Sequence, residues 1–283
     1  MARRLLAAGN QVVAWNRSAA KLKALIADGA HAAASPSDVA ARADLIGLCL
    51  TSHEVVEEIA WGPQGLFAVP LNGPKVVADF STGSPSSAAT FATRAQAHGA
   101  LWVDAPVSGG VPAAAAGTLV IFAGGGQESI TALQPLLGPL AARVSHMGSA
   151  GAGQTTKICN QMVVACIVML IAEMIALARK AGLDVGALPA SLKGGFADSL
   201  PLQIFGPRMA AHRFEPRLGA IALMEKDVNL AAALSAQNNA YTPMLERARQ
   251  LYATARDQSG VDVAADISKL VCLFESLSLD EKK

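Results

Sequence analysis

The sequence is poor in charge and has almost no net charge. Of its 283 residues 16% are charged, and the formal net charge is +1. Proteins that bind nucleic acid or acidic surfaces through electrostatics carry a clear basic excess, so we expect no such partner here. The length suits one large or two medium domains, and the 52% hydrophobic content is typical of a soluble globular chain.

Cysteine is also scarce, and its spacing excludes two classes of site. The chain has four cysteines, at Cys49, Cys159, Cys166 and Cys272. They show no CxxC spacing and have no histidine pair nearby, so we predict neither a metal site nor a disulfide framework. We expect four buried thiols in a reducing compartment, and therefore a cytoplasmic protein.

No segment predicts a membrane span or a signal peptide. The longest apolar run covers residues 162–172 and ends at Glu173, short of the roughly 20 residues that a span needs. We predict a buried core helix instead, and no membrane partner. The first nine residues contain two arginines but lack a long apolar region and a cleavage pattern. Internal repeats, low-complexity tracts and flexible linkers are absent as well.

A GxGxxG loop is missing too, although the start otherwise resembles a dinucleotide-binding unit. Such a unit runs strand, GxGxxG, helix, strand, and it meets the cofactor ribose at the end of the second strand. Here residues 1–8 resemble the back half of a helix, and residues 11–15 a short buried strand. The first strand and the glycine loop are therefore absent from this sequence. Two explanations remain open: a translation start upstream, which we favour, or a remnant that binds no cofactor.

The residues after this strand indicate which cofactor would bind. The strand ends in Asn16, Arg17 and Ser18. An acidic residue there would bind the ribose 2′-hydroxyl of NAD, whereas an arginine can pair with the 2′-phosphate of NADP. We therefore expect NADP, with NAD as the alternative, although a surface arginine after a strand is the commoner meaning of Arg17 alone.

Strands and helices alternate up to about residue 150. Residues 45–50 form a continuous apolar strand, of the kind buried on both faces, whose last residue, Leu50, is followed by Thr51 and Ser52. Residues 76–80 predict the next strand, followed by a turn with Thr82. Ligands of open parallel sheets bind outside these strand ends. Thr82 could hydrogen-bond a nicotinamide ribose or simply cap the helix at 86–98.

A third strand end carries a serine and two glycines. The strand near residues 101–103 leads to Ser108, Gly109 and Gly110, whose hydroxyl and backbone N–H groups could surround a carboxylate. A plain glycine turn is the commoner meaning of such a tripeptide. Residues 119–123 and 143–145 predict the last strands, with a turn at 124–126.

From residue 151 the pattern becomes helical. A glycine-rich turn opens a helix of about 30 residues, in which Lys157 and Asn160 project from one face. Apolar residues keep helical spacing in 154–181, 187–193, 201–212, 219–239, 243–258 and 264–276. Lys226 and Asp227 lie amid apolar residues, either as a solvated pair or with the lysine reaching a cofactor. We predict two domains, 1–150 and 151–283.

Three motifs together resemble the β-hydroxyacid dehydrogenase family. They are DAPVSGG at 104–110, GAGQTTKICNQ at 151–161, and the Lys226–Asp227 pair. The family includes 3-hydroxyisobutyrate dehydrogenase and tartronate semialdehyde reductase, and the similarity covers essentially the whole chain. It implies an α/β Rossmann-like N-terminal domain, here without its first strand and glycine loop, a long interdomain helix and an all-α C-terminal domain that usually makes the oligomer contact. We expect a homodimer or homotetramer.

The resemblance also assigns roles to single residues. It implies that Lys157 is catalytic, that Asn160, Ser108, Gly109 and Gly110 bind a small carboxylate-bearing substrate, and that Thr82 and Lys226 contact the cofactor. The Asn-Gln ending of the lysine motif, with Gly194 and Gly195, resembles tartronate semialdehyde reductase more than 6-phosphogluconate dehydrogenase. By their place at strand ends we add Asn16, Arg17, Ser18, Leu50 and Thr51 to the expected cofactor contacts.

The chemistry fits a lysine. Reduction of a carbonyl by hydride builds negative charge on the oxygen, so a proton donor must be close. Lys157 could donate that proton as an ammonium group, or remove one in the alcohol-oxidising direction. Because a lysine of pKa about 10.4 is a poor base at neutral pH, desolvation or a second cation such as Lys226 should lower its pKa.

Two other functions stay open. An imine reductase shares this scaffold, but that group usually replaces the lysine with aspartate or tyrosine. A cofactor-free oligomerising or binding protein is favoured only by the absent glycine loop. Within the leading hypothesis the substrate itself is open, although we expect Phe196, Ser199 and Met224 to contribute to its selection.

Overall fold

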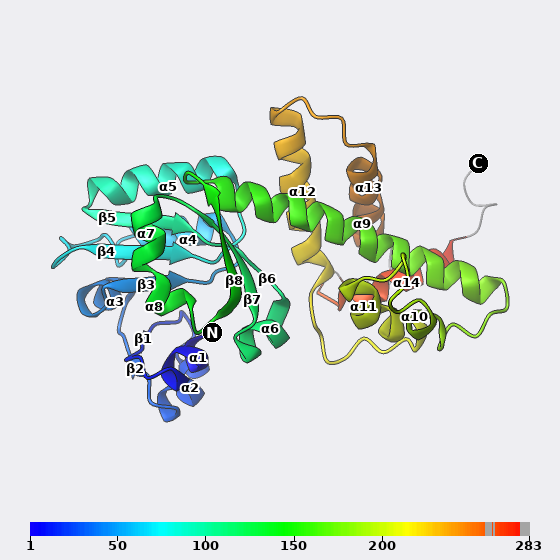
Figure 1. The fold of residues 1–283 in the computed structure, drawn as a ribbon, viewed down its shortest axis with the longest axis horizontal. Coiled ribbons are helices and arrows are strands. Elements are labelled where there is room, and N and C mark those ends of the chain that lie inside the picture. Colours follow the sequence, from blue (N-terminus) through cyan, green and yellow to red (C-terminus); the bar gives the residue numbers. More distant parts are fainter. Residues whose placement is uncertain (258–261, 263, 278–283) are drawn as a thin grey trace. The chain divides into compact units, whose positions relative to one another are not determined.

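The computed structural model describes residues 1–257, 262 and 264–277, and its contacts divide the chain into two compact units (Figure 1). The first unit covers residues 1–157 and the second residues 158–283. The division falls within helix α9 (Ala152–Lys180), whereas the sequence placed it between residues 150 and 151. The first turns of α9 count with the first unit because they are hydrogen-bonded to its sheet, as described below.

The first unit begins with a small two-stranded sheet. Its elements are α1 (Ala2–Ala7), β1 (Val13–Ala14), the 3₁₀ helix η1 (Ala19–Leu22), α2 (Lys23–Ala27) and β2 (His31–Ala32). Strand β1 lies within the predicted 11–15 segment and pairs in parallel with β2, which the sequence did not predict because both its residues are exposed and it is only two residues long. Among the described strands, none joins this pair to the larger sheet.

The larger sheet has six strands in the order β3-β4-β5-β7-β6, with β8 paired to β7. They are β3 (Leu45–Leu48), β4 (Lys75–Asp79), β5 (Ala100–Asp104), β6 (Val107–Ser108), β7 (Leu119–Gly124) and β8 (Ala141–Gly148). Strands β3, β4 and β5 are parallel, and their register sets Leu48 beside Asp79 and Asp79 beside Asp104. The three strands therefore end at one level, which is where ligands of parallel sheets bind.

Six helices complete this unit. They are α3 (Pro36–Arg42), α4 (His53–Trp61), α5 (Pro85–Ala97), α6 (Gly110–Ala116), α7 (Gln127–Ala132) and α8 (Gln134–Leu137). Hydrophobic cores lie on both faces of the sheet: Val76 and Ala78 of β4 belong to one cluster, and Val77 belongs to the other. Successive strand residues point to opposite faces, so β4 is buried throughout, as its apolar sequence predicts.

Three burial predictions were wrong. The segment 11–15, expected to be a short buried strand, is half-buried at residues 12–15 and exposed at Gln11. Strand β3 is buried on one face only, since Ile46 and Leu48 are buried while Gly47 is exposed. The reason is its position at the edge of the sheet, where it pairs with β4 alone among the described strands. The cysteines are not buried thiols either: Cys49 and Cys159 are exposed, and Cys166 and Cys272 are half-buried.

The second unit is helical, as predicted. After α9 come α10 (Leu188–Ser191), α11 (Leu200–Ala210), α12 (Ile221–Gln237), α13 (Pro243–Asp257), the 3₁₀ helix η2 (Ile267–Leu270) and α14 (Val271–Ser276). Its described residues contain no strand beyond an isolated bridge between Ala220 and Asp266. One core holds it together, with α9 contributing buried residues at helical spacing such as Ile158, Ala165 and Ala172.

Helix α9 is long and apolar enough, by length and composition, to cross a membrane. An 18-residue window of it has a mean hydropathy of 2.3, and 39% of that window is buried within the fold. The central helix of a soluble protein passes the same test. In this chain Ala165, Val168 and Ala172 of α9 lie in the core of the second unit while Val163 and Leu170 are exposed, so the run 162–172, predicted as a buried core helix, is buried only in part.

Candidate active site

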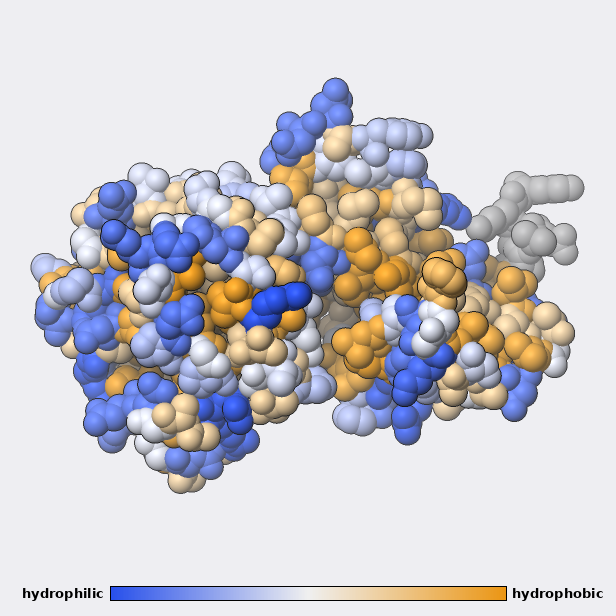
Figure 2. Space-filling model, viewed as in Figure 1, coloured by the Kyte–Doolittle hydropathy of each residue, from blue (hydrophilic) through white to orange (hydrophobic). Residues whose placement is uncertain are grey.

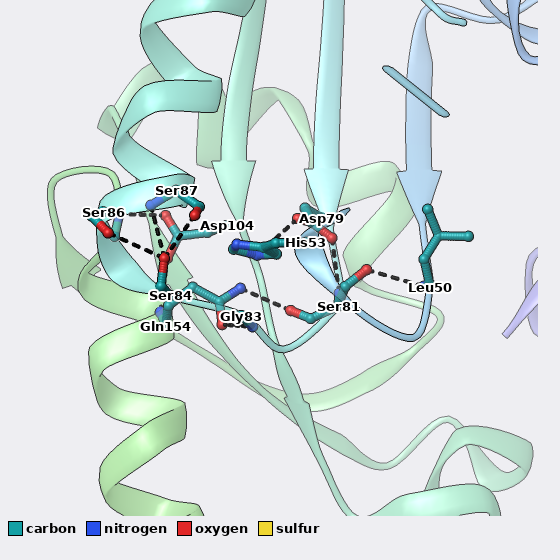
Figure 3. Close-up of polar contacts among 11 residues, drawn as sticks. Leu50, His53, Asp79, Ser81, Gly83, Ser84, Ser86, Ser87, Asp104 and Gln154 are labelled. Carbon is teal, nitrogen blue, oxygen red and sulfur yellow. Dashed lines mark hydrogen bonds and ion pairs between the residues drawn. The ribbon is translucent and has the colours of Figure 1, made fainter. Parts of the chain in front are cut away.

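The aligned ends of β3, β4 and β5 gather a network of buried polar groups (Figure 3). Ser81, which follows β4, is at its centre: its N–H donates to Asp79 Oδ1 at 2.9 Å, and its Oγ accepts from the Leu50 N–H at 3.0 Å. The loops that carry Leu50 and Thr82 are thereby joined. Both were predicted as cofactor contacts from their places at strand ends.

Thr82 does not cap the following helix. The cap of α5 is Ser84, whose Oγ accepts the Ser87 N–H at 3.0 Å (Figure 3). Thr82 itself is half-buried in the turn between β4 and α5, and Thr51 is exposed in the turn after β3. The simpler of the two roles considered for Thr82 is therefore filled by another residue.

A buried histidine and carboxylate lie beneath these loops. His53, at the start of α4, places Nε2 3.5 Å from Asp79 Oδ2, and the two side chains are 5% and 0% exposed. The His53 ring packs against Phe91, with centroids 5.1 Å apart, and against the backbone of Gly83, where a Cβ would overlap the ring. Burial raises the pKa of Asp79 to about 7, opposed by its hydrogen bonds from Ser81 and assisted by the nearby Asp104.

The raised pKa of Asp79 predicts a stability that depends on pH. Between pH 4 and 7 the folded chain holds a proton that the unfolded chain has lost, so the free energy of unfolding falls as pH rises through this window. The full contribution is present below the unfolded pKa, and the difference between about 7 and 3.8 corresponds to roughly 4 kcal/mol.

Asp79→Asn should remove this dependence. Urea unfolding at pH 4 to 8 is expected to show the wild-type chain losing stability relative to the variant as pH rises. Parallel curves for the two proteins would contradict the assignment. His53 and Asp104 face the same group, so the difference between the curves reports Asp79 together with its coupling to these two side chains.

Asp104 fixes the start of α9. Its Oδ1 accepts the Gly151 N–H at 2.7 Å and its Oδ2 accepts the Gln154 N–H at 2.8 Å. Burial raises the pKa of Asp104 to about 6, while the backbone donors, Gly151 and Gln154 first, lower it. At neutral pH the carboxylate therefore caps the helix and offsets its positive end.

Gly153 lets the first turn of α9 approach the sheet. A Cβ at this position would lie 2.7 Å from the Asp104 carbonyl oxygen and would also overlap the Phe122 carbonyl. Gln154, the next residue, is fully buried. Lys157 follows one turn later on the same helix and is only 7% exposed.

Asn160 lies three residues beyond Lys157 on α9, as predicted, within the residues of the second unit. Its Nδ2 donates to Gln161 Oε1 at 2.9 Å, and Gln161 Nε2 donates to Asp227 Oδ2 at 2.6 Å. Asn160 is half-buried. The amide is thus held in one orientation by a neighbour that is itself anchored to α12.

The serine-glycine-glycine segment forms a strand end and a helix start. Ser108 ends β6, and Gly109 precedes α6 with φ of 123°. Gly110 has φ of 64°, so both glycines occupy the region that side chains disfavour. Ser108 is half-buried and the two glycines are exposed.

The remaining predicted residues fall in two places. Asn16, Arg17 and Ser18 are exposed after β1, where Asn16 Oδ1 accepts the Ser18 N–H at 2.9 Å. Lys226 lies on α12 in the helical unit, with its Nζ 3.2 Å from Asp227 Oδ1. The structure joins the loops that carry Leu50 and Thr82 and the start of the lysine helix in one network.

The three residues proposed to select the substrate lie in different surroundings. Phe196 is fully exposed, and Ser199 caps α11 by accepting the Leu202 N–H at 3.2 Å. Met224 lies on α12, where its sulfur accepts from Gln161 Nε2 at 3.9 Å. Among the described residues no group of three or more potential ligands could hold a metal ion.

The sequence analysis did not predict His53, Asp79 and Gln154 as parts of this site. It included Asp104 in a motif but assigned it no function. Asp104 and Gln154 stand inside the two motifs, DAPVSGG and GAGQTTKICNQ, so their place there was a usable signal. No sequence signal marks His53 and Asp79, because only the fold brings the start of α4 next to the end of β4.

A nicotinamide cofactor fits part of what is present. Hydroxyl side chains stand after β3 and β4, at the strand ends where such a cofactor binds, and an exposed arginine rather than an acid follows β1. The sequence contains no GxGxxG segment to cradle the pyrophosphate. The residues present therefore suit the two riboses of the cofactor, and its pyrophosphate lacks the usual glycine loop.

The fold and these strand-end loops define a two-domain, nicotinamide-dependent oxidoreductase. Residues 1–148 match the model of the NAD binding domain of 6-phosphogluconate dehydrogenase, and residues 151–274 match that of the NAD-binding domain of NADP-dependent 3-hydroxyisobutyrate dehydrogenase. The chain belongs to the β-hydroxyacid dehydrogenase family, as its motifs indicated, and is an enzyme of the NAD(P)-dependent type.

Curated relatives cover nearly the whole chain. It is 33% identical to 2-hydroxy-3-oxopropionate reductase of Escherichia coli, over 90% of this chain and 86% of that one. It is 32% identical to 3-hydroxyisobutyrate dehydrogenase of Pseudomonas aeruginosa, over 97% of this chain and 94% of that one.

Solved structures confirm the fold. The 3-hydroxyisobutyrate dehydrogenase of Mycobacterium tuberculosis with L-serine is 31% identical with a TM-score of 0.82, covering 97% of this chain and 94% of that one. Psf3 in complex with NADP⁺ and 2-OPP is 26% identical with a TM-score of 0.87, covering 96% and 94%. An imine reductase from Pseudomonas sp., 22% identical with a TM-score of 0.62, shares the fold alone.

Proposed function

We propose that the chain interconverts a small β-hydroxy acid and its semialdehyde or keto acid, with Lys157 as the general acid and base. The observation that carries this proposal is the burial of Lys157 on a helix start that Asp104 and Gly153 hold against the ends of the sheet. A solvated helix lysine, the simplest alternative, would not be 7% exposed.

The other residues bind and orient the substrate. The Ser108 hydroxyl and the N–H groups of Gly109 and Gly110 bind its carboxylate, as donors suited to an anion. Asn160 holds the hydroxyl or carbonyl without competing for the proton, since its amide does not titrate. The nicotinamide cofactor supplies or accepts the hydride when bound. Lys157 donates the proton to the substrate oxygen in reduction and removes it in oxidation.

We propose NADP as the preferred cofactor, on the strength of Arg17. The residue is exposed at the end of β1, with Asn16 and Ser18 beside it and no acidic side chain in this turn. A carboxylate at this place would favour the ribose 2′-hydroxyl of NAD, whereas a guanidinium can pair with a 2′-phosphate.

Arg17→Ala should raise the KM for NADPH about tenfold and leave the KM for NADH unchanged, because one charge-assisted contact to the 2′-phosphate is lost. Lys21→Ala, which removes an exposed positive charge four residues on, is the matched control. Equal effects of the two variants would mean general electrostatic attraction, and an unchanged KM for NADPH in Arg17→Ala would contradict the proposal.

The reaction itself is tested by a substrate panel. Small aldehyde acids and β-hydroxy acids are offered with NADH and with NADPH, and the absorbance of the reduced cofactor is followed. Turnover of acids that carry a β-hydroxyl or β-carbonyl supports the proposal. Turnover of cyclic imines only would favour the imine reductase alternative, which the lysine at position 157 argues against.

We also propose that the chain works as a homodimer or homotetramer. Val163, Leu170 and Leu177 of α9 are 55%, 64% and 68% exposed in the single chain, and their spacing of seven places them on one helix face. Figure 2 shows further hydrophobic side chains on the visible surface of the helical unit. Light scattering after size exclusion gives the mass, and a monomer at micromolar concentration would contradict this proposal.

A further inference from the structure

The side chain of Gln154 is fully used in a two-point contact with the β4–α5 loop. Its Oε1 accepts the Gly83 N–H at 3.0 Å, and its Nε2 donates to the Ser81 carbonyl at 2.8 Å (Figure 3). The two bonded groups flank Thr82. A carboxamide that accepts from one peptide group and donates to another fixes both distance and orientation, which a single hydrogen bond does not.

The same residue is bound on its backbone side to the next strand. The Gln154 N–H donates to Asp104 Oδ2 at 2.8 Å, and Gln154 and Asp104 are both fully buried. Gln154 therefore links the end of β5 with the loop after β4. Through Ser81, whose Oγ accepts the Leu50 N–H, the link extends to the loop after β3.

Lys157 stands three residues after Gln154 on α9, so the two side chains project from neighbouring positions of one helix face. Hydrogen bonds therefore connect the lysine-bearing start of α9 with the loops that carry Thr51 and Thr82, all within the first unit. A displacement of this start by 1 Å can cost about 100-fold in rate when it carries a reacting group.

We propose that Gln154 is a positioning residue, which holds the lysine-bearing start of α9 in register with the Ser81–Gly83 loop and so fixes the lysine relative to the proposed cofactor loops. This inference rests on the proposed function of Lys157. Gln154 acts through its two backbone partners and has no part in proton transfer.

Gln154→Leu keeps the approximate volume and removes both bonds. We expect kcat to fall by about 10-fold to 100-fold with little change in the KM for the acid, because Ser108, Gly109 and Gly110, which bind the carboxylate, lie outside α9 and stay in place while the lysine start shifts. Hydrogen exchange, read by mass spectrometry on peptides that contain Gly83, should show at least a tenfold loss of protection of that amide. The exchange measurement needs neither substrate nor cofactor.

Gln154→Glu provides a rescue. An ionised carboxylate accepts from Gly83 but cannot donate to the Ser81 carbonyl, whereas the protonated acid can do both. Burial favours the protonated form, so kcat of this variant, taken as a ratio to wild type, should rise as pH falls from 8 to 6. The ratio is needed because Asp104, Asp79 and His53 face this region in both proteins, and the pKa values of the two carboxyl groups are raised toward this pH range.

Val77→Ala is the control for simple destabilisation. Val77 is fully buried in β4 and lies outside the network, so its truncation lowers Tm without touching the contact between α9 and the loop. At a temperature well below both transitions kcat of this control should stay within about twofold of wild type.

The outcomes distinguish the positioning role of Gln154 from the proposed function of the chain. Loss of Gly83 protection with kcat above a third of wild type would overturn the positioning role while the proposed function stands. Unchanged protection would overturn the contact itself. A folded wild-type chain without turnover would refute the proposed function and the positioning role with it. Should Gln154→Leu not fold, the pH-dependent ratio of Gln154→Glu decides, and a flat ratio counts against the inference.

Discussion

Lys157→Ala is expected to lower kcat by about 10²-fold to 10⁴-fold, the contribution that a positioned acid or base typically makes. The reason is the loss of the one side chain in the first turns of α9 that can transfer a proton at the substrate oxygen. The KM for the acid should change far less, since Ser108 and the two glycines bind the carboxylate. Steady-state kinetics in both directions measures the two constants.

The control is Lys193→Ala, which removes an exposed lysine elsewhere and should leave kcat unchanged. Circular dichroism shows whether each variant is folded. If Lys157→Ala keeps more than about a tenth of wild-type kcat, the acid–base role is wrong.

Gly153→Ala should strongly destabilise the fold. The added methyl group would overlap the Phe122 carbonyl and come within 2.7 Å of the Asp104 carbonyl, and both are backbone atoms of the sheet. We expect a loss of about 3 kcal/mol in unfolding free energy, the upper part of the range for overpacking, together with loss of activity as the helix start is pushed from the sheet.

Gly126→Ala is the matched control. Gly126 lies at the N-terminal end of a helix of the first unit, directly before α7, but its Cβ would meet only Ser129 Oγ at 3.6 Å, an ordinary contact. Denaturant unfolding should show a change within about 0.5 kcal/mol for this variant. Equal stability of the Gly153→Ala and Gly126→Ala proteins would mean that α9 does not press on the sheet as described.

The strand ends of the site could be predicted because their signals are local. Apolar runs followed by Thr51 or Thr82 mark the ends of parallel strands, and the glycine-rich turn before Lys157 marks a helix start. The serine and two glycines mark a strand end too, but that strand, β6, is antiparallel to its neighbour β7. The all-helical second unit follows from spacing alone. These features need only a window of about 18 residues.

The network that holds these ends could not be predicted, since its partners are far apart in the chain. Gln154 binds residues 81 and 83, and Asp104 binds residues 151 and 154. No pattern in one sequence pairs such groups. A buried glutamine inside a helix motif looks the same, in letters, as a solvated one.

The edge position of β3 explains why its burial on both faces was predicted wrongly. An apolar run is equally compatible with a central strand and an edge strand, because periodicity shows which residues avoid water and not which strand lies alongside. Cys159 was misplaced for a related reason: it follows Ile158 of the buried stripe and lies on the next, exposed position of α9.

The most direct test of the central claim follows the hydride itself. The wild-type chain is incubated with NADPH that carries deuterium on the transferred side of C4 and with a small aldehyde acid taken from the panel, and the product is analysed by mass spectrometry. The account predicts a β-hydroxy acid that is heavier by one deuterium. A product without the label, or no product from folded protein with any aldehyde or keto acid of the panel, would contradict it.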